Sequence, residues 1–200
     1  MARRNDHSRD EIQRMAIAAA ISILNQEGAS SLSTRKVASA IGYTVGTLYL
    51  VFKNLDELLL HVNAATLEEL KETIISESAS QQNPLDQIKA MAFAYLGFAR
   101  QHYARWSLLY SHQLPEGMSI PAWFDAKVKE VFILVEEPLR QIKKNMNHTE
   151  TVCATRVLWS GVHGACELAL NDKLSLGGEI SAEQLIESMI NNYLAGLMRG

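Results

Sequence analysis

The sequence predicts an all-α protein of about nine helices. Apolar residues recur at three- and four-residue spacings in one segment after another, which is the period of an amphipathic helix. Capping residues, prolines and glycines bound many of these segments. No segment shows the alternation of a strand, and no internal repeat or low-complexity tract interrupts the helical pattern.

The first predicted helix runs from a capping box to a stop signal. Ser8 and Glu11 have the spacing of a capping box, and Gly28 can end the helix. Between them lies one apolar stripe, made of Ile12, Met15, Ala16, Ala19, Ala20, Ile23 and Leu24. This stripe can share a small core with the two helices that follow.

Residues 33–53 have the pattern of a helix-turn-helix DNA-binding unit. Ser33 can cap the first short helix, and Gly42 supplies the turn because glycine takes positive φ without steric cost. The spacing turns two apolar sets inward: Thr34, Val37, Ala38 and Ile41, then Val45, Leu48, Tyr49 and Phe52. The residues left wholly or partly available are Thr44, Gly46, Thr47, Leu50 and Lys53. Hydroxyls, a glycine and a lysine suit a groove lined with phosphates and base edges, although an ordinary helical hairpin is the alternative.

The remaining sequence also reads as helices. Asn54 can cap a helix that reaches about residue 77, and Asn83 with Pro84 opens another that runs toward Trp106. The further predicted segments are 106–112, 121–146 with a bend near Pro138, 149–171 and 181–198. We therefore expect a DNA-binding domain in residues 1–53 and an effector-binding and dimerisation domain in residues 54–200.

Composition and charge favour a cytoplasmic protein that binds DNA at one end. Of the 200 residues 48% are hydrophobic, yet no apolar run is long enough to span a bilayer and the N-terminus does not resemble a signal peptide. The formal net charge of −3 is unevenly divided: residues 1–53 carry +3 and the other residues −6. Positive charge therefore lies where steering toward DNA needs it.

Enzyme chemistry is not indicated. The sequence has no glycine-rich phosphate loop, nucleophile elbow, His-x-x-x-His or Cys-x-x-Cys motif, so no catalytic residue, cofactor or metal site is expected. Cys153 and Cys166 fall in one predicted helix, about 20 Å apart along its axis, too far to pair. We expect both to be reduced thiols in the core, with redox sensing by an exposed thiol as the alternative.

The N-terminal motifs, over residues 8–62, resemble the TetR family of transcriptional regulators. They are a helix ending in Glu27-Gly28, then Leu-Ser-x-Arg-x-Val-Ala, Ile-Gly-Tyr-Thr-x-Gly-Thr-Leu-Tyr, Phe-Lys and Asp-Glu-Leu-Leu. A second segment, Trp159-Ser-Gly-Val-His-Gly164, resembles a Trp-His-Gly pattern in the C-terminal domain of some members. The resemblance implies an all-helical regulator of double-stranded operator DNA.

The predicted DNA-binding residues are Arg35, Thr44, Val45, Gly46, Thr47, Tyr49 and Lys53. Family members often have a basic or polar residue where this chain has Val45, a lysine where it has Leu55 and an aromatic residue where it has Val51. These departures remove potential phosphate contacts, so we expect modest affinity and salt dependence. The basic stretch at residues 2–5 can compensate by reaching an adjacent minor groove, or it is a solvated tail.

Aromatic side chains are dense in the second half and suggest a site for a small, largely apolar effector. The predicted ligand-binding residues are Trp106, Tyr110, Trp123, Trp159 and His163. The alternative is that they form a solid core. Gly161, Gly164 and Ala165 would let a neighbouring helix approach closely, and the last helix has a broad apolar stripe. These features predict a homodimer through helices 149–171 and 181–198, with a purely internal core as the alternative.

Together these features predict a one-component, ligand-responsive regulator, with repression the expected sign. The helix near residues 44–50 would enter the major groove, and two half-sites about 34–36 Å apart, or a multiple of that, would be met at once. A rearrangement passed along residues 54–77 would release DNA. The main alternative is a helical ligand-binding or scaffold protein with a degenerate helix-turn-helix, motivated by Val45 and Leu55; a helical enzyme comes third.

Overall fold

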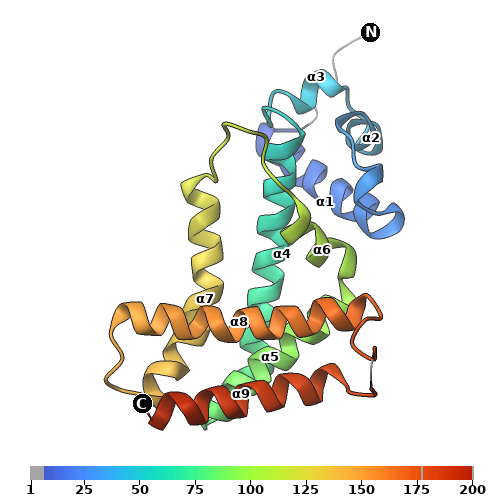
Figure 1. Ribbon diagram of the computed structural model, residues 1–200. Helices are drawn as coiled ribbons and strands as arrows, with labels where there is room; N and C mark the ends of the chain where they lie inside the picture. The colour runs from blue at the N-terminus through green and yellow to red at the C-terminus, as the bar shows by residue number, and fades with distance from the viewer. Residues whose placement is uncertain (1–6, 177, 200) are drawn as a thin grey trace. The chain divides into compact units, whose positions relative to one another are not determined.

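The computed structural model describes residues 7–176 and 178–199 (Figure 1). These residues form nine α-helices and one short 3-10 helix, without a strand, which confirms the predicted fold class. The α-helices are α1 Arg9–Glu27, α2 Thr34–Ala40, α3 Val45–Leu48, α4 Leu55–Ser78, α5 Pro84–Gln101, α6 Tyr103–Ser111, α7 Ala122–Ile142, α8 His148–Leu170 and α9 Ala182–Arg199, with the 3-10 helix at Ala29–Ser31. None of the described helices combines the length and apolarity needed to cross a membrane.

The predicted start and end of α1 are confirmed in detail. The backbone N–H of Glu11 donates to the Ser8 hydroxyl at 3.3 Å, and the N–H of Ser8 donates to the Glu11 carboxylate at 2.6 Å. Hydrogen bonding to the Glu11 carboxylate, first by the Ser8 backbone N–H and then by the Ser8 side chain, holds the pKa of Glu11 below its usual value. At the other end Gly28 has φ +81° and its N–H donates to the carbonyl of Leu24. Local sequence signals therefore fix this helix.

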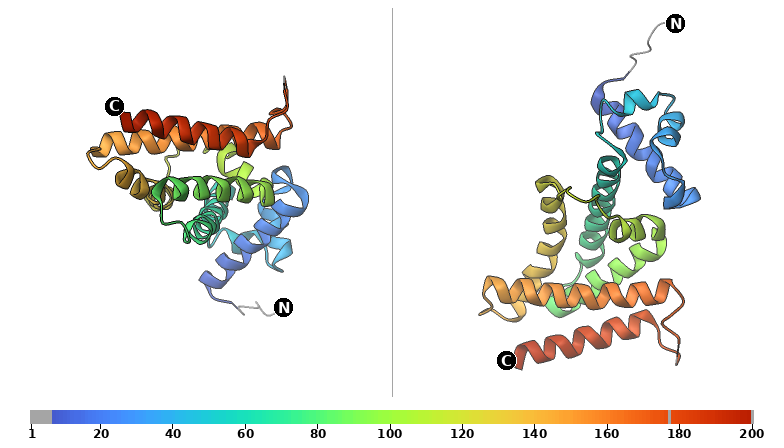
Figure 2. Two further views of the ribbon diagram at one scale, coloured as in Figure 1. Left: turned by 90° about the horizontal axis from the view of Figure 1, so that it is seen from below. Right: turned by 45° about the horizontal axis from the view of Figure 1, so that its top comes forward.

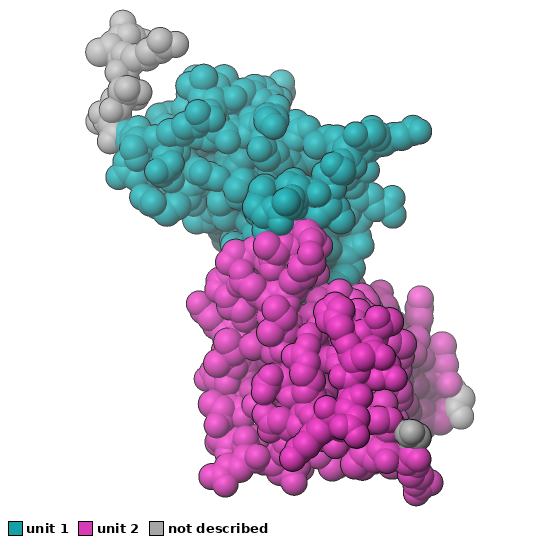
Figure 3. All heavy atoms as spheres, turned by 90° about the vertical axis from the view of Figure 1, so that its left-hand side faces the viewer, with its two compact units in different colours: residues 1–66, 104–124 teal, residues 67–103, 125–200 magenta. Residues whose placement is uncertain are grey.

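The chain divides into two compact units, coloured separately in Figure 3. Unit 1 contains the chain up to Thr66 together with Ala104–Phe124; unit 2 contains Leu67–Tyr103 and the chain from Asp125 onward. Helix α4 contributes to both units. The two units are defined by how the chain packs. The boundary expected after residue 53 separates a DNA-binding domain from an effector-binding and dimerisation domain, and it stays a prediction.

The core of unit 1 joins the first three helices to parts of α4 and α6. Its central side chains are Ala16, Ala20, Leu24, Val37, Leu48, Phe52, Leu58, Val62 and Leu108. Phe52 follows α3 and is almost fully buried, so it anchors the end of that helix to the core. The small side chain of Ala38 is also buried here, as the close crossing of two short helices requires.

In unit 2, helices α5, α8 and α9 pack against one another, and α8 and α9 lie side by side in all views (Figure 2). Leu158, Val162 and Ala165 of α8 are buried, as are Ile186, Ile190 and Leu194 of α9. A Cβ placed on Gly161 would lie 2.9 Å from the Met189 Cε atom, so this glycine already faces a helix of its own chain.

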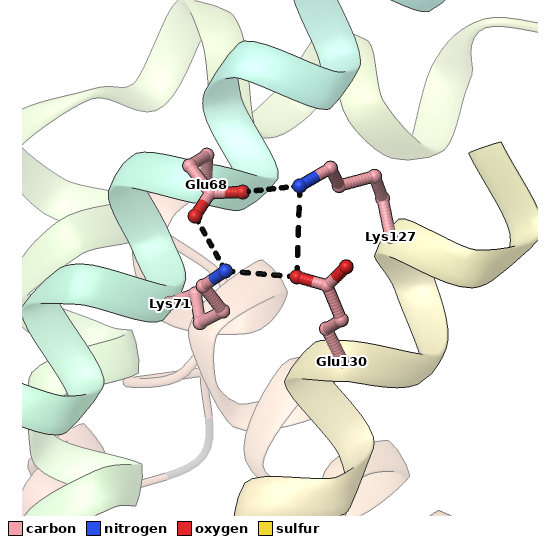
Figure 4. A network of polar contacts seen from close by, with 4 residues as sticks. All are labelled: Glu68, Lys71, Lys127 and Glu130. Carbon is pink, nitrogen blue, oxygen red and sulfur yellow. Dashed lines mark hydrogen bonds and ion pairs between the residues drawn. The ribbon is translucent and has the colours of Figure 1, made fainter. Parts of the chain in front are cut away.

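A ring of alternating charges ties α7 to the second half of α4 (Figure 4). Lys71 Nζ lies 2.8 Å from a Glu130 carboxylate oxygen, and Lys127 Nζ lies 2.7 Å from one of Glu68. Hydrogen bonds to the two glutamates raise the pKa of Lys71 to about 12, and the lysines lower the pKa of Glu68 and Glu130. All four groups are therefore charged at neutral pH.

The boundary between α5 and α6 differs from the sequence prediction, and α7 ends at Ile142 and not at residue 146. The apolar run that was expected to continue from Pro84 toward Trp106 breaks at His102, which has φ −122° and ψ 36°. Its N–H still donates to the Phe98 carbonyl at 2.9 Å, and α6 begins one residue later. Neither glycine nor proline marks this break, so the pattern of residues could not reveal it.

Candidate nucleic-acid interface

The turn before α3 is built as the sequence predicted. Gly42 has φ +75°, and the backbone N–H of Tyr43 returns to the carbonyl of Ala38 at 2.9 Å. Thr44 caps α3 by accepting a hydrogen bond from the N–H of Thr47 at 3.3 Å. The two threonine hydroxyls also lie 3.1 Å apart, so each helps to orient the other.

Most of the predicted DNA-binding residues lie at the surface of unit 1. Arg35, Thr44, Gly46 and Lys53 are exposed, and Thr47 is partly exposed. An outside partner can therefore reach a continuous stretch of hydroxyl groups, backbone and positive charge.

Two other residues of this stretch behave differently from each other. The apolar spacing placed Tyr49 on the inward face, but the structure corrects this: 53% of the residue is exposed, because Leu48 and Phe52 fill the core position. Val45, by contrast, packs against the core of unit 1 and is only partly accessible. Of the predicted DNA-binding set, Val45 therefore offers the least side chain to an outside partner.

The junction between α3 and α4 explains one departure from the family pattern. Leu55 packs against the core of unit 1, so this position supports the fold with an apolar side chain where relatives often have lysine. Asn54 caps α4 as predicted, accepting from the N–H of Glu57 at 2.8 Å. The Glu57 carboxylate accepts from the N–H of Lys53. The backbone that carries the Lys53 side chain is thereby held in place.

Three contacts around the helix-turn-helix were not anticipated from the sequence. His7 Nδ1 lies 2.7 Å from the Tyr43 hydroxyl, which ties the chain before α1 to the turn. His61 stacks on Trp123 with ring centroids 4.7 Å apart and contacts the edge of Phe52 at 5.6 Å. Burial lowers the pKa of His61. None of these contacts follows from the spacing of neighbouring residues in the sequence. The basic stretch at residues 2–5 lies outside the described residues.

The five predicted ligand-binding residues are placed in three groups. In unit 1 the fully buried Trp106 contacts Tyr110 edge-on, with centroids 5.5 Å apart, while Trp123 stacks on His61. In unit 2 Trp159 stacks on His163 at 5.4 Å. The effector role of all five stays a prediction.

The group in unit 2 is larger than the sequence suggested. The Tyr95 hydroxyl lies 3.0 Å from His163 Nδ1, and Phe132 meets Trp159 edge-on at 5.6 Å. The Arg156 guanidinium lies 3.2 Å from the centre of the Phe132 ring, which is a cation–π contact. Burial lowers the pKa of His163, so its ring is neutral at pH 7. Residues of α5, α7 and α8 thus form one aromatic cluster with polar ends.

Unit 2 also has a groove between α4 and α5, with a volume of about 350 Å³. Its lining residues are Thr73, Glu77, Ala90, Phe93, Ala94, Gly97, Phe98 and Gln101. None of the five predicted ligand-binding residues lines it. The sequence could not reveal this groove because it depends on which faces of two helices meet.

Both cysteines are free thiols, as predicted, but only Cys166 has the expected core position. Cys153 is exposed and Cys166 is buried, both on α8, and neither forms a disulfide. Burial raises the pKa of Cys166 to about 12, so this thiol stays protonated and unreactive at neutral pH.

The fold and the surface of α3 define a helix-turn-helix DNA-binding protein. Residues 16–62 match the family model described as bacterial regulatory proteins, tetR family, and residues 88–193 match the tetracyclin repressor-like, C-terminal domain. The chain therefore belongs to the TetR family, whose members are transcription regulators and not enzymes.

Solved structures share this fold at low sequence identity. A protein of unknown function from Rhodococcus sp. RHA1 is 18% identical with a TM-score of 0.75, and 98% of each chain is covered. The TetR family regulator PfmR from Thermus thermophilus is 16% identical with a TM-score of 0.60, covering 91% of this chain and 98% of PfmR. AibR, solved with isovaleryl coenzyme A and operator DNA, is 17% identical with a TM-score of 0.60, covering 90% of this chain and 97% of AibR. No curated protein sequence matches the chain.

Proposed function

We propose that the protein is a cytoplasmic, homodimeric repressor that reads operator DNA with α3 and releases it when a small, largely apolar effector binds. The observation that carries the proposal is the exposed surface around α3. There Thr44, Gly46, Thr47 and Tyr49 present hydroxyls and bare backbone next to Lys53. Such a surface suits the edges of bases and the phosphates that flank them.

The outer face of α8 supports the proposed dimer. Val157 and Leu168 are 42% and 43% exposed, and a Cβ placed on Gly164, which lies between them, would meet no atom within 4 Å. These residues leave an apolar strip with room for a second helix to approach. Gly161 and Ala165, which the sequence also suggested for this contact, are used within the chain: Gly161 faces Met189 and Ala165 is buried.

The aromatic cluster of unit 2 supports the proposed effector site. Tyr95, Phe132 and Trp159 offer apolar surface, and His163 adds a neutral polar group. A few polar groups in an otherwise apolar region are typical of ligand sites. AibR was solved with isovaleryl coenzyme A, and the acyl group of that ligand is small and apolar, so isovalerate is a rational first compound to test against this chain.

The test is DNA binding by variants of the α3 surface. We expect the purified protein to select a duplex from a random-sequence library and Thr47→Ala to weaken its binding, since a hydroxyl on the reading surface is lost. Lys53→Ala should weaken binding to all sequences alike and reduce the salt slope by about one, because one phosphate contact is lost. Mobility shifts across a salt series measure both effects.

The matched control is Lys173→Ala, which removes a positive charge from unit 2 and should leave the salt slope unchanged. If folded wild-type protein selects no duplex at low salt, the alternative of a helical ligand-binding or scaffold protein with a degenerate helix-turn-helix replaces this proposal.

A further inference from the structure

The exposed face of the α3 region contains one large aliphatic side chain. Leu50, just after α3, is 68% exposed, which is more than the neighbouring Tyr49. The N–H of Leu50 donates to the Thr47 carbonyl at 3.1 Å, so the helical turn continues past Leu48. Gly46 lies four residues before Leu50, which places these two residues on the same side of the turn.

The other exposed groups of this surface suit polar contacts with DNA. An exposed leucine cannot make such contacts, so its contact would have to be with an apolar group of the DNA. Gly46 presents no side chain, and the groove of a duplex can therefore approach the backbone closely at the level of Leu50. Among the base edges of the major groove, the 5-methyl of thymine is the apolar group that a protein side chain can contact. Bringing the leucine against that methyl removes apolar surface of both partners from water.

We propose that Leu50 is a specificity-determining residue that packs against the 5-methyl group of a thymine in each operator half-site. The proposal rests on the proposed use of α3 as the reading helix. It assigns base preference to an apolar contact, beside the hydrogen bonds and phosphate contacts that Thr47 and Lys53 can make. The thymine lies at the level of the groove that Gly46 leaves open.

The experiment replaces thymine by deoxyuridine, which removes only the 5-methyl group. The probe is a duplex selected by the wild-type protein from a random-sequence library, with each thymine replaced in turn. We expect one position in each half-site at which deoxyuridine weakens wild-type binding about fourfold, equivalent to the roughly 0.8 kcal/mol of one buried methyl. Leu50→Ala should bind more weakly overall and bind the thymine and deoxyuridine duplexes equally.

Leu176→Ala is the matched control, because Leu176 is also a highly exposed leucine, at 78%, but lies in unit 2. It should keep the wild-type sensitivity to deoxyuridine. The inference is overturned if no single deoxyuridine weakens wild-type binding, or if Leu50→Ala keeps the same sensitive position, since another residue then contacts the methyl. Failure to select any duplex would overturn the proposed DNA binding itself, which is a distinct result.

Discussion

At Gly46 an effect on the stability of the fold can be distinguished from an effect on DNA binding. A Cβ at this position would meet the Thr44 Oγ1 atom at 3.6 Å, an ordinary van der Waals distance, and the glycine does not have positive φ. Alanine is also the better helix former by about 0.8–1.0 kcal/mol. The fold therefore does not require glycine here, which is consistent with the proposed close approach of DNA to this backbone.

We expect Gly46→Ala to unfold at the same or a higher temperature while binding the selected duplex several-fold more weakly, because the new methyl group stands between backbone and groove. Thermal unfolding and mobility shifts at one salt concentration check the two effects. Gly42→Ala is the contrasting variant: its positive φ makes alanine strained, so stability should fall. Wild-type affinity of Gly46→Ala would show that DNA does not approach this backbone closely.

The titration of His163 should make the folded protein less stable as the pH falls. Burial lowers its pKa below the unperturbed value of about 6.5, so the folded protein binds this proton less readily than the unfolded chain. The corresponding stability is fully present above the unfolded pKa and is lost as pH falls through the range below it. The nearby Glu167 opposes the shift, but burial is the larger effect.

We therefore expect His163→Gln to lose less stability than the wild type between pH 7 and pH 5, as measured by urea unfolding at several pH values. His61 has a pKa lowered by burial in the same way, so the wild-type slope should fall in part and not to zero. Tyr95→Phe is the control, because it removes the 3.0 Å hydroxyl contact of His163 without removing the titrating group. An unchanged pH dependence in His163→Gln would contradict this account.

At the scale of helices, prediction succeeded where the signal is local. The Ser8 and Asn54 caps, the Gly42 turn and the spacing of α1 are all properties of neighbouring residues, and the structure confirms each. The break at His102 has no such signal. The placement of Leu108 from α6 in the core of unit 1 depends on packing between distant segments.

The site shows the same division. Exposure of Thr44, Gly46 and Lys53 followed from the helical period of a short segment. The stack of His61 on Trp123, by contrast, joins residues far apart in the sequence, and the orientation of Gly161 toward Met189 depends on how α8 and α9 meet. Small residues on a helix predict close approach, but not which helix approaches.

That distinction gives a test of the proposed dimer. We expect Gly164→Leu to shift the protein from dimer to monomer in sedimentation, because the new side chain enters space that is open within the chain and would be filled by a partner. Gly161→Leu should instead destabilise each subunit by about 1–3 kcal/mol through overpacking against Met189. Gly97→Leu on α5, at an equally open glycine, is the matched control and should remain dimeric. A wild-type protein that is monomeric at micromolar concentration would contradict the dimer.

At the scale of the whole molecule, the chain passes between its two units at three points. It crosses at residues 66–67 inside α4, at 103–104 at the start of α6 and at 124–125 inside α7. The sequence suggested that a rearrangement passes along residues 54–77, which correspond to α4, and α6 and α7 provide further covalent connections. In unit 1, Trp123 of α7 contacts His61, which contacts Phe52 beside α3. The proposed coupling between the two units therefore has three covalent connections through which it can act.

Thermodynamic linkage makes such coupling measurable from either side. A ligand that lowers operator affinity by some factor must itself be bound more weakly, by the same factor, when operator is present. We expect about 5- to 150-fold, corresponding to the usual coupling of about 1–3 kcal/mol. Isovalerate, the proposed first test compound, is titrated against the protein with and without saturating duplex, and binding is followed by tryptophan fluorescence because Trp159 lies in the aromatic cluster. Thr47→Ala, which should weaken the duplex alone, should leave ligand affinity of the free protein unchanged. A ligand that binds equally well with and without duplex would show that it does not regulate DNA binding.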